Sequence, residues 1–316
     1  MNTLQNAVSF FTEEKHTMSM LSLACGTAET VYRAMGGTAE ASVGESTLFD
    51  LASLTKLFTC IAAMRLWEDG SLRLNEPVTA YAPRFTHLSG VTVDQLLGFE
   101  VQLKTAGRVD EAPDREAALR ALLGTTASPQ GTGRYYSDIH AMVLRHVIEA
   151  AAGERLYAYL DRVLLTPLGM RETFAAVPKD RLRDCGCYDR EHRIEGDRWI
   201  IREGVAPGMP HDPKARILSP DGTELCGHAG LFATIGDMIR LCQGVLRGQV
   251  LSPESLRAMS RNRLGRPLPG GGWTQYLGSQ CYVRHPNQYD SEIPVYMGRR
   301  AIGLSGFTGN HISIDP

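Results

Sequence analysis

Hydrophobic and polar residues in the first part of the chain follow first a helical pattern and then a strand pattern. Residues 2–14 are amphipathic and predict an opening helix. The runs 18–24 and 30–35 are typical of strands. The short link 25–29 suits a tight connection, so we expect these two runs to pair as a hairpin.

The next segment, LASLTKLFTCIAAMRLWEDG, has a clear helical period. Its apolar residues at helical spacing are Leu54, Leu57, Phe58, Ile61 and Met64. They predict a helix with one apolar face, which ends at Gly70. Ser53 then lies at the start of the helix, and Lys56 lies one turn further on the same side.

The middle of the chain, residues 70–200, also predicts mainly helices. Residues 91–97 form a short helix with a threonine cap, and residues 138–152 form a longer one that Gly153 ends. A third helix is expected over 157–165, stopped by Pro167.

Strand patterns return in the final third, after a stretch over 175–222 that we interpret as long loops with short strands. A helix is predicted over 236–247. Strands are predicted at 281–283, 301–304 and 311–314. Sheet segments at both ends with helices between them indicate the α+β class. We therefore expect a sheet domain made of residues 1–60 and 220–316, and a mainly helical domain made of residues 61–219.

Composition narrows the class of protein. The chain has 316 residues, is 43% hydrophobic and carries a formal net charge of −2, which is typical of a globular protein with a substantial core. This charge argues against a nucleic-acid partner, and no apolar run is long enough to cross a membrane. No signal peptide is visible, so we expect a cytoplasmic protein that acts on a small-molecule or peptide substrate. The oligomeric state stays open.

Cysteine usage gives no sign of a disulfide framework. The seven cysteines are an odd number scattered along a large chain, which favours free thiols. Cys185, Cys187 and His192 lie close together in sequence, but their spacing is not that of a standard zinc site and no second pair completes four ligands. We expect neither a metal nor another cofactor.

Ser53 and Lys56 could form a nucleophile and its base. A serine hydroxyl needs a base within hydrogen-bond reach, and a lysine one helical turn away can supply it. At a helix start, the serine N–H is also free to stabilise an oxyanion. Ser53 is the only serine in the chain with a lysine three residues later. Such a pair is weak evidence alone, because a solvated lysine on an amphipathic helix gives the same pattern.

Four blocks occur in a fixed order along the chain: FDLASLTKLFT, RYYSDIHAMVLRHVIEAAAG, GHAGLFATIGDM and GLSGFTGNHISIDP. With these blocks the sequence resembles the serine β-lactamase and penicillin-binding-protein superfamily, and in particular the branch of class C β-lactamases, D-alanyl-D-alanine carboxypeptidases and related esterases. The resemblance runs from about residue 15 to the last residue. It implies a β-lactamase/transpeptidase-like fold, with an antiparallel sheet flanked by helices.

The resemblance also implies roles for individual residues. Ser53 would be the acylated serine, Lys56 its lysine, and Tyr136 the tyrosine that shuttles protons. Asp138 takes the place of an asparagine in the Tyr-x-Asn motif, so it keeps an acceptor but loses the amide donors. We prefer Tyr136 to its neighbour Tyr135 because of the register of the following helix.

The third family motif, Lys- or His-Thr-Gly, is matched by Leu304-Ser305-Gly306. Ser305 and Gly306 would contact substrate, whereas Leu304 cannot replace the usual cation. The N–H groups of Ser53 and Phe307 are implied as the two oxyanion donors.

Three further features can be compared with the family: a loop at the rim of the site, the C-terminal end and two histidines. Residues 96–102 replace a family loop at the rim of the site. The resemblance implies another strand and a C-terminal helix after the equivalent of Pro316, so we expect either that this sequence is a fragment or that this member fills the gap in the sheet differently. His211 and His228 lie within family blocks, where we favour a structural role for each.

Together these features predict a serine hydrolase that cleaves an amide or ester through a Ser53 acyl-enzyme. The alternative is a non-catalytic homologue that binds a peptide or a ligand derived from the cell wall. Leu304 and the expected lack of a C-terminal strand favour that alternative.

Overall fold

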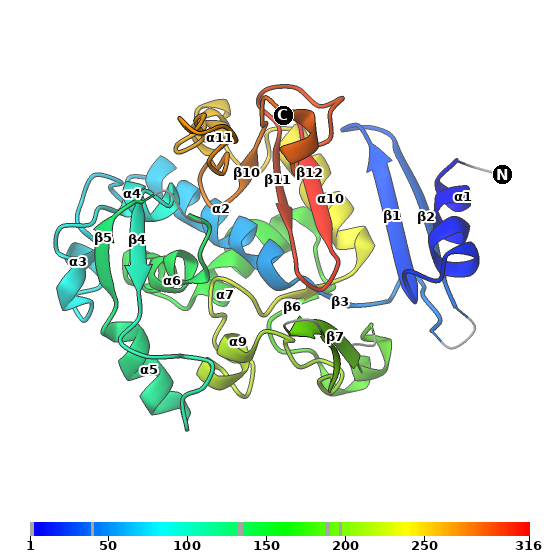
Figure 1. Ribbon diagram of the computed structural model, residues 1–316, viewed down its shortest axis with the longest axis horizontal. Helices are drawn as coiled ribbons and strands as arrows, with labels where there is room; N and C mark the ends of the chain where they lie inside the picture. Colours follow the sequence, from blue (N-terminus) through cyan, green and yellow to red (C-terminus); the bar gives the residue numbers. More distant parts are fainter. Residues whose placement is uncertain (1–2, 39–40, 132–134, 187–189, 196–197) are drawn as a thin grey trace.

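The computed structural model describes residues 3–38, 41–131, 135–186, 190–195 and 198–316. Helices occupy the centre and one side of the molecule, and the N-terminal hairpin with its helix forms the opposite edge (Figure 1). The α-helices are α1 (Thr3–Ser9), α2 (Thr55–Glu68), α3 (Val78–Tyr81), α4 (Val93–Leu97), α5 (Arg115–Leu123), α6 (Asp138–Ala152), α7 (Leu156–Leu160), α8 (Thr166–Leu168), α9 (Pro213–Leu218), α10 (Ile235–Leu246) and α11 (Pro253–Ser260). Shorter helical segments are η1 (Phe10–Glu14), η2 (Ala52–Leu54), η3 (Thr86–Leu88), η4 (Asp161–Leu165), η5 (Lys179–Asp184) and η6 (Gln288–Asp290).

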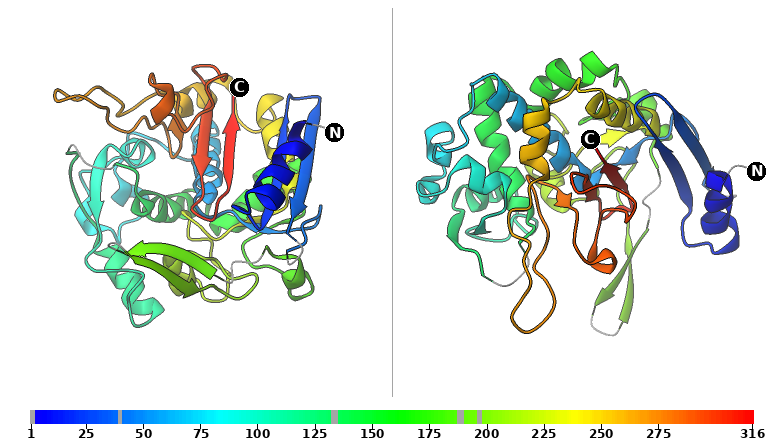
Figure 2. Two further views of the ribbon diagram at one scale, coloured as in Figure 1. Left: turned by 45° about the vertical axis from the view of Figure 1, so that its right-hand side comes forward. Right: turned by 90° about the horizontal axis from the view of Figure 1, so that it is seen from above.

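All strand pairings within the named sheets are antiparallel. The strands are β1 (Met20–Gly26), β2 (Val31–Gly37), β3 (Phe49–Asp50), β4 (Val101–Lys104), β5 (Thr126–Pro129), β6 (Thr173–Phe174), β7 (Arg190–Glu195), β8 (Arg198–Glu203), β9 (Phe232–Ala233), β10 (Tyr282–Val283), β11 (Ile302–Ser305) and β12 (His311–Ile314). They form the sheets β1–β2, β10–β11–β12, β3–β9–β6, β4–β5 and β7–β8. The β7–β8 hairpin projects from the body of the molecule (Figure 2).

The N-terminal helix and hairpin confirm the sequence prediction. The helix α1 continues as the π-helical turn η1 to Glu14, and β1 pairs with β2 from Met20–Gly37 to Gly26–Val31. Val8 on α1 is fully buried. A methyl group placed on Gly36 of β2 would lie 2.7 Å from the Val8 side chain, so this glycine lets α1 lie directly on the hairpin.

The sheet β1–β2 and the sheet β10–β11–β12 are separate, and no ladder joins β1 to β12 within the ranges given above. The helix α10 contacts both β1 and β12. Figures 1 and 2 show it behind the two sheets. The N-terminal hairpin is therefore linked to the rest of the molecule by a shared helix.

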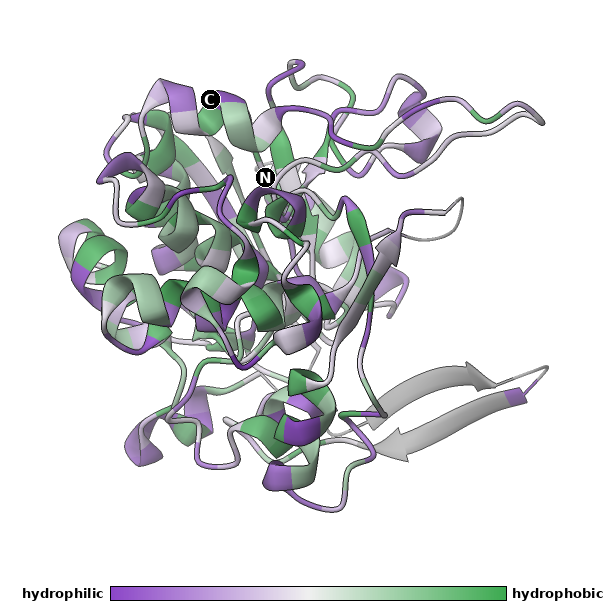
Figure 3. Ribbon diagram, turned by 90° about the vertical axis from the view of Figure 1, so that its left-hand side faces the viewer, coloured by the Kyte–Doolittle hydropathy of each residue, from purple (hydrophilic) through white to green (hydrophobic). Residues whose placement is uncertain are grey.

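Helix α2 differs from the prediction of a single apolar face. It is buried on every side from Thr55 to Met64, including its small and polar residues Thr59, Cys60, Ala62 and Ala63. Its neighbours include α6 and α7. Figure 3 shows the hydrophobic residues concentrated in the packed helices of this region. Small side chains on the remaining faces of α2 let other helices approach it closely, so it is a central helix of the core.

The predicted caps are confirmed for two helices. Thr92 and Gln95 form a reciprocal capping box at the start of α4. Helix α6 begins at Asp138, after the N-cap Ser137, and ends at Ala152 because Gly153 adopts a left-handed conformation with φ of 70°.

Two helical predictions need correction. Pro167 does not stop the helix that begins at Leu156, because it lies in the first turn of α8, where its missing N–H costs nothing. Gly169, with φ of 67°, ends this helical segment instead. Helix α11 was not predicted, although Ser252 and Pro253 give it a typical N-cap and first turn.

Helices α2 and α6 are both too short to span a bilayer, and so is every other helix that the structure describes. The division of the chain into two domains, with its boundaries at residues 60 and 220, stays a prediction.

Gly227 offers a test of the packing between α6 and the segment before β9. Its φ is +85°, and a methyl group there would lie 2.5 Å from the carbonyl oxygen of Ala141. We expect Gly227→Ala to lower the free energy of unfolding by at least about 2 kcal/mol more than Gly153→Ala, since the clash adds to backbone strain. Urea unfolding of both variants measures the difference. Gly153 is the matched control, because its φ is also positive and nothing lies within 4 Å of an added methyl group. Equal losses in the two variants would contradict the packing described.

Candidate active site

The candidate nucleophile Ser53 follows a residue with an unusual backbone conformation. Ala52 has φ of +45°, a region that non-glycine residues rarely adopt. Its N–H donates to Oδ1 of Asp50 at 2.9 Å. The other carboxylate oxygen, Oδ2, accepts the N–H of His211 at 2.6 Å. The Asp50 carboxylate thus holds the backbone that presents Ser53 at the start of η2.

Burial raises the pKa of Asp50 to about 6, outweighing the hydrogen bonds from His211 and Ala52, which lower it. The carbonyl oxygen of Asp50 also accepts hydrogen bonds from Thr308 Oγ1 at 2.8 Å and Asn310 Nδ2 at 2.6 Å. Asp50 therefore connects the loop after β11 to the strand that leads into Ser53.

Lys56 lies one turn after Ser53, as the sequence predicted, and its side chain has no exposed surface. Its Nζ donates to Ser53 Oγ at 2.8 Å and to the carbonyl oxygen of His228 at 3.3 Å. It also lies 2.8 Å from Oδ1 of Asp138. An ammonium group has three donors and no acceptor, and these three oxygens match it.

The charge of Lys56 is stabilised in spite of its burial. Burial alone would lower the pKa of this lysine, but the charge of Asp138, with further contributions from Tyr136, holds it above its ordinary value. Lys56 is therefore an ammonium at neutral pH when the site is empty of substrate.

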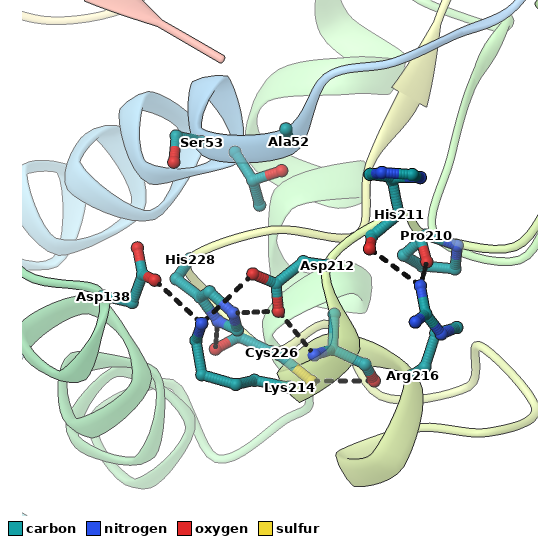
Figure 4. A network of polar contacts seen from close by, with 12 residues as sticks. Ala52, Ser53, Asp138, Pro210, His211, Asp212, Lys214, Arg216, Cys226 and His228 are labelled. Carbon is teal, nitrogen blue, oxygen red and sulfur yellow. Dashed lines mark hydrogen bonds and ion pairs between the residues drawn. The ribbon is translucent and has the colours of Figure 1, made fainter. Parts of the chain in front are cut away.

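A second lysine, which the sequence analysis did not identify, extends the site. Lys214 Nζ lies 3.1 Å from Asp138 Oδ2 and 3.3 Å from Asp212 Oδ2. Asp212 Oδ1 in turn lies 2.9 Å from His228 Nε2 (Figure 4). We call Lys56, Asp138, Lys214 and Asp212 the charged cluster. Its two lysines and two aspartates alternate in sign, so their formal charges cancel.

The aspartates of the charged cluster are held as carboxylates. Burial would raise the pKa of Asp138, but the charge of Lys56, with a further contribution from Lys214, keeps it well below its usual range. The pKa of Asp212 is lowered in the same way, since His228 and Lys214 outweigh its burial. The ion pairs therefore persist throughout the neutral pH range.

Asp212 could have been recognised from the sequence as a helix cap. It precedes Pro213 at the start of α9, and its Oδ1 accepts the N–H of Ala215 at 2.9 Å. Its position beside His228 could not, because that contact joins two segments by tertiary packing. His228 contributes both its ring and its carbonyl oxygen to the site.

Asp138, Asp212 and His228 could in principle bind a metal ion, since one ligand atom from each lies within 4.8 Å of the others. Lys214 Nζ contacts both aspartates and so supplies the positive charge that such an ion would bring. The residues present thus do not fit a metal site here. The other metal hypothesis cannot be compared with the structure, because Cys187 and the side chain of His192 lie outside the described residues.

The structure places Tyr136, and not Tyr135, against Lys56. Lys56 Nζ lies 4.9 Å from the centroid of the Tyr136 ring. That ring stacks on Tyr282 at 5.6 Å and packs against Phe99 at 5.4 Å. The Tyr135 hydroxyl instead donates to the carbonyl oxygen of Gly131 at 2.8 Å. The preference for Tyr136 thus agrees with the geometry.

The loop after β11 closes the other side of the site. A methyl group on Gly306 would lie 2.7 Å from the carbonyl oxygen of Leu51, so β11 passes directly beside η2. Phe307, the next residue, has a side chain that is 55% exposed and packs against His211 with ring centroids 5.2 Å apart. This brings the two predicted oxyanion donors, the N–H groups of Ser53 and Phe307, to neighbouring segments.

Leu304 and Ser305 have different environments. Leu304 is fully buried, whereas Ser305 is partly exposed and donates to Glu292 Oε2 at 3.1 Å. The Ser305 hydroxyl also lies 2.9 Å from Nδ1 of His311, its partner on β12. Burial lowers the pKa of His311, against an opposing effect of Glu292, so this imidazole is neutral at pH 7. Neither Leu304 nor His311 therefore supplies a positive charge at this edge.

Comparison with known proteins shows the family of the chain. A sequence model of the family described as Beta-lactamase matches residues 4–316. The chain belongs to the β-lactamase family.

The chain is also similar to one curated relative and to two solved structures, and the solved structures share its fold. Esterase EstB of Burkholderia gladioli is 27% identical over 305 residues, which cover 82% of this chain and 74% of EstB. The solved structure of EstCE1, described as a hydrolase with promiscuous acyltransferase activity, has a TM-score of 0.74 at 20% identity and covers 98% of this chain and 89% of its own. A class C β-lactamase structure has a TM-score of 0.69 at 18% identity, covering 99% and 87%.

These findings confirm the predicted superfamily and the β-lactamase/transpeptidase-like fold. As a member of the β-lactamase family, the chain is a serine hydrolase. The roles of Ser53, Lys56, Tyr136, Asp138, Ser305, Gly306 and Phe307 are not tested by the comparisons and stay predictions.

Asp138→Asn tests the ion pair with Lys56. We expect the variant to lose about 3 kcal/mol of unfolding free energy at pH 7, because a fully buried ammonium loses its carboxylate. The Asp138 pKa is lower in the native state than in the unfolded chain, so its contribution is complete above the ordinary carboxyl pKa of 3.8 and is lost as the pH falls below it.

Urea unfolding of the wild type and the variant over a range of pH measures this difference. It should shrink as the solution becomes acidic. The exposed Asp180 provides a matched control, for which Asp180→Asn should change the stability by less than about 0.5 kcal/mol. A difference between wild type and Asp138→Asn that does not depend on pH would show that the carboxylate charge does not stabilise Lys56.

Proposed function

We propose that this protein hydrolyses uncharged esters, and amides without a carboxylate beside the scissile bond, through an acyl-enzyme on Ser53. The observation that carries the proposal is the position of Lys56 Nζ, 2.8 Å from both Ser53 Oγ and Asp138 Oδ1 within a fully buried side chain. A lysine that only formed part of the solvated surface of a helix would stay exposed, because burying its charge costs free energy.

In the proposed acylation step, Ser53 Oγ attacks the substrate carbonyl carbon as its proton is removed. Lys56, an ammonium in the resting site, cannot accept that proton directly. Tyr136 is therefore the proposed acceptor in its phenolate form, which the Lys56 charge, 4.9 Å from the ring centroid, stabilises, and it becomes a neutral phenol when it takes the Ser53 proton. Tyr136 then returns the proton to the leaving alcohol or amine.

The oxyanion of the tetrahedral intermediate would accept hydrogen bonds from the backbone N–H groups of Ser53 and Phe307. The first N–H groups of a helical segment lack partners in that segment, which suits Ser53 at the start of η2. The strained conformation of Ala52 and the close contact of Gly306 with Leu51 fix the relative positions of the two segments. Water then attacks the acyl-enzyme by the reverse sequence of proton transfers and releases the acid.

The proposed substrate class follows from the charges around Ser53. The charged cluster has no net formal charge, and the third motif offers Leu304 and a neutral His311 in place of a cation. A substrate carboxylate would lose its hydration without a positive partner. Penicillins and peptides ending in D-alanine carry such a carboxylate, whereas simple esters do not. The esterase name of EstB is in line with this choice.

Ser53→Ala tests the acyl-enzyme. The wild type should hydrolyse p-nitrophenyl butyrate and form a covalent adduct with a fluorophosphonate, which peptide mass spectrometry locates on Ser53. The variant should form no adduct and lose at least about a thousandfold in kcat, since the nucleophile is gone.

Ser71→Ala, at an exposed serine, is the matched control and should retain activity and labelling. A folded wild-type protein that shows neither turnover nor adduct would instead support the alternative of a non-catalytic binding protein.

Substrate charge provides a separate test. The value of kcat/KM for p-nitrophenyl butyrate should exceed that for the similar ester p-nitrophenyl hemisuccinate by at least about tenfold, because an unpaired carboxylate costs more than about 1.4 kcal/mol in the site. Initial rates at pH 7 measure both values. A preference for the carboxylate ester would contradict the proposed substrate class and leave the acyl-enzyme intact.

A further inference from the structure

A second cavity lies away from Ser53, where α5, α6 and the end of α9 meet. Its volume is about 280 Å³. Helix α5 contacts α9, and Figure 1 shows both at the lower edge of the molecule. Asp138 is the first residue of α6, and Arg145 of the cavity is seven residues later, which corresponds to about 10 Å along the helix axis. Neither Ser53 nor any residue of the charged cluster lines the cavity, although Cys226 of its wall is two residues before His228.

Arginines dominate the polar lining of this cavity. Arg84, Arg115, Arg145 and Arg155 all line it, with Glu224 as the acidic residue of the lining. The carboxylate oxygens of Glu224 form ion pairs with the guanidinium nitrogens of three arginines. The N–O distances are 2.7 Å to Arg145, 2.9 Å to Arg115 and 3.1 Å to Arg155.

Glu149, just outside the lining, forms further ion pairs with Arg145 and Arg155. Four arginines against these two glutamates leave an excess of positive charge at the cavity.

Two polar groups of the cavity wall have no partner of their own in the described ranges. Arg84 is exposed and forms neither an ion pair nor a side-chain hydrogen bond there. The Nε2 atom of His146 is buried without a hydrogen bond. Burial, and next the charge of Arg145, lower the pKa of His146 to about 3, so its ring is neutral at pH 7 and can donate from one nitrogen. A buried nitrogen of this kind is normally satisfied by a partner.

Apolar side chains complete the wall. They are Leu119, Leu122, Met142, Leu218 and Cys226. The guanidinium group of an arginine can donate two parallel hydrogen bonds to the oxygens of a carboxylate or phosphate. The apolar side chains can contact the carbon skeleton of the same ligand. The volume corresponds to about nine water molecules and lies at the small end of pockets that bind organic ligands.

We propose that this cavity binds a small organic anion, with a carboxylate or phosphate group held by Arg84 and the neighbouring arginines and with its carbon skeleton against the leucines. The site does not require the acyl-enzyme chemistry at Ser53. It adds a binding function to the protein, and its ligand need not be a substrate.

Calorimetric titration of the full chain at constant ionic strength tests the site with three probes: sodium benzoate, inorganic phosphate and the neutral benzamide. Benzoate should bind most tightly, phosphate more weakly, and benzamide should not bind. Arg84→Gln should weaken benzoate binding about tenfold, the loss expected for one charge-assisted hydrogen bond. Arg84 is exposed, so this variant should fold like the wild type.

Arg257→Gln is the matched control, because Arg257 is also an exposed arginine without an ion pair in the described part of the chain, but lies on α11. Its affinity for benzoate should stay within about twofold of wild type, as expected for a surface change far from the site. Protein labelled at Ser53 by a fluorophosphonate, or the Ser53→Ala variant, should bind benzoate unchanged.

Three results would overturn the proposal. The first is no binding of benzoate or phosphate up to about 10 mM, above the millimolar range of weak ligands. The second is equal affinity of wild type and Arg84→Gln. The third is loss of benzoate binding when Ser53 is blocked, which would place the anion in the candidate active site.

Discussion

The arrangement around Ser53 depends on the burial of one ammonium group. A lysine with no exposed surface is tolerated only if each of its donors finds an oxygen atom. For Lys56 these oxygens come from its own helix, from Asp138 at the start of α6 and from the backbone of His228 before β9. Three segments distant in sequence must therefore meet at one nitrogen atom. An ion pair of this kind contributes little net stability but favours one arrangement of the chain over others.

The partners of Lys56 have partners of their own. Asp138 is shared with Lys214, and Lys214 with Asp212, so each buried charge has a neighbour of opposite sign. Asp212 also caps α9 and binds the ring of His228, which ties the loop before β9 to the same network. The carboxylate of Asp50 has a corresponding role on the other side of η2, where it holds the backbone of Ala52. Both faces of the nucleophile are therefore positioned by buried carboxylates.

Much of this could be predicted from the sequence, because it depends on local periods and caps. The spacing of Ser53 and Lys56, the start of α6 at Asp138 and its end at Gly153 are local features. The left-handed conformation of Ala52 could not be predicted, since alanine has no preference for it and the Asp50 contact imposes it. The sequence analysis missed that α2 is buried on all sides from Thr55 to Met64, because small residues such as Ala62 do not form a recognisable apolar face. Lys214 was missed because only tertiary packing brings it to Asp138.

The balance of charge in the cluster has a consequence for how such a site can diverge. Lys214 and Asp212 belong to a short helix far from the nucleophile in sequence, and the structure shows them in contact with Asp138 and His228, not with Ser53. Replacing Lys214 by a neutral residue would lower the net charge beside the nucleophile by one full unit without removing a group that contacts Ser53. Under the proposed function, a single substitution in α9 would thus alter which substrate charges the site accepts. Changes in α9 would then alter the substrate preference, while the residues of η2 and α2 would continue to provide the same reaction chemistry.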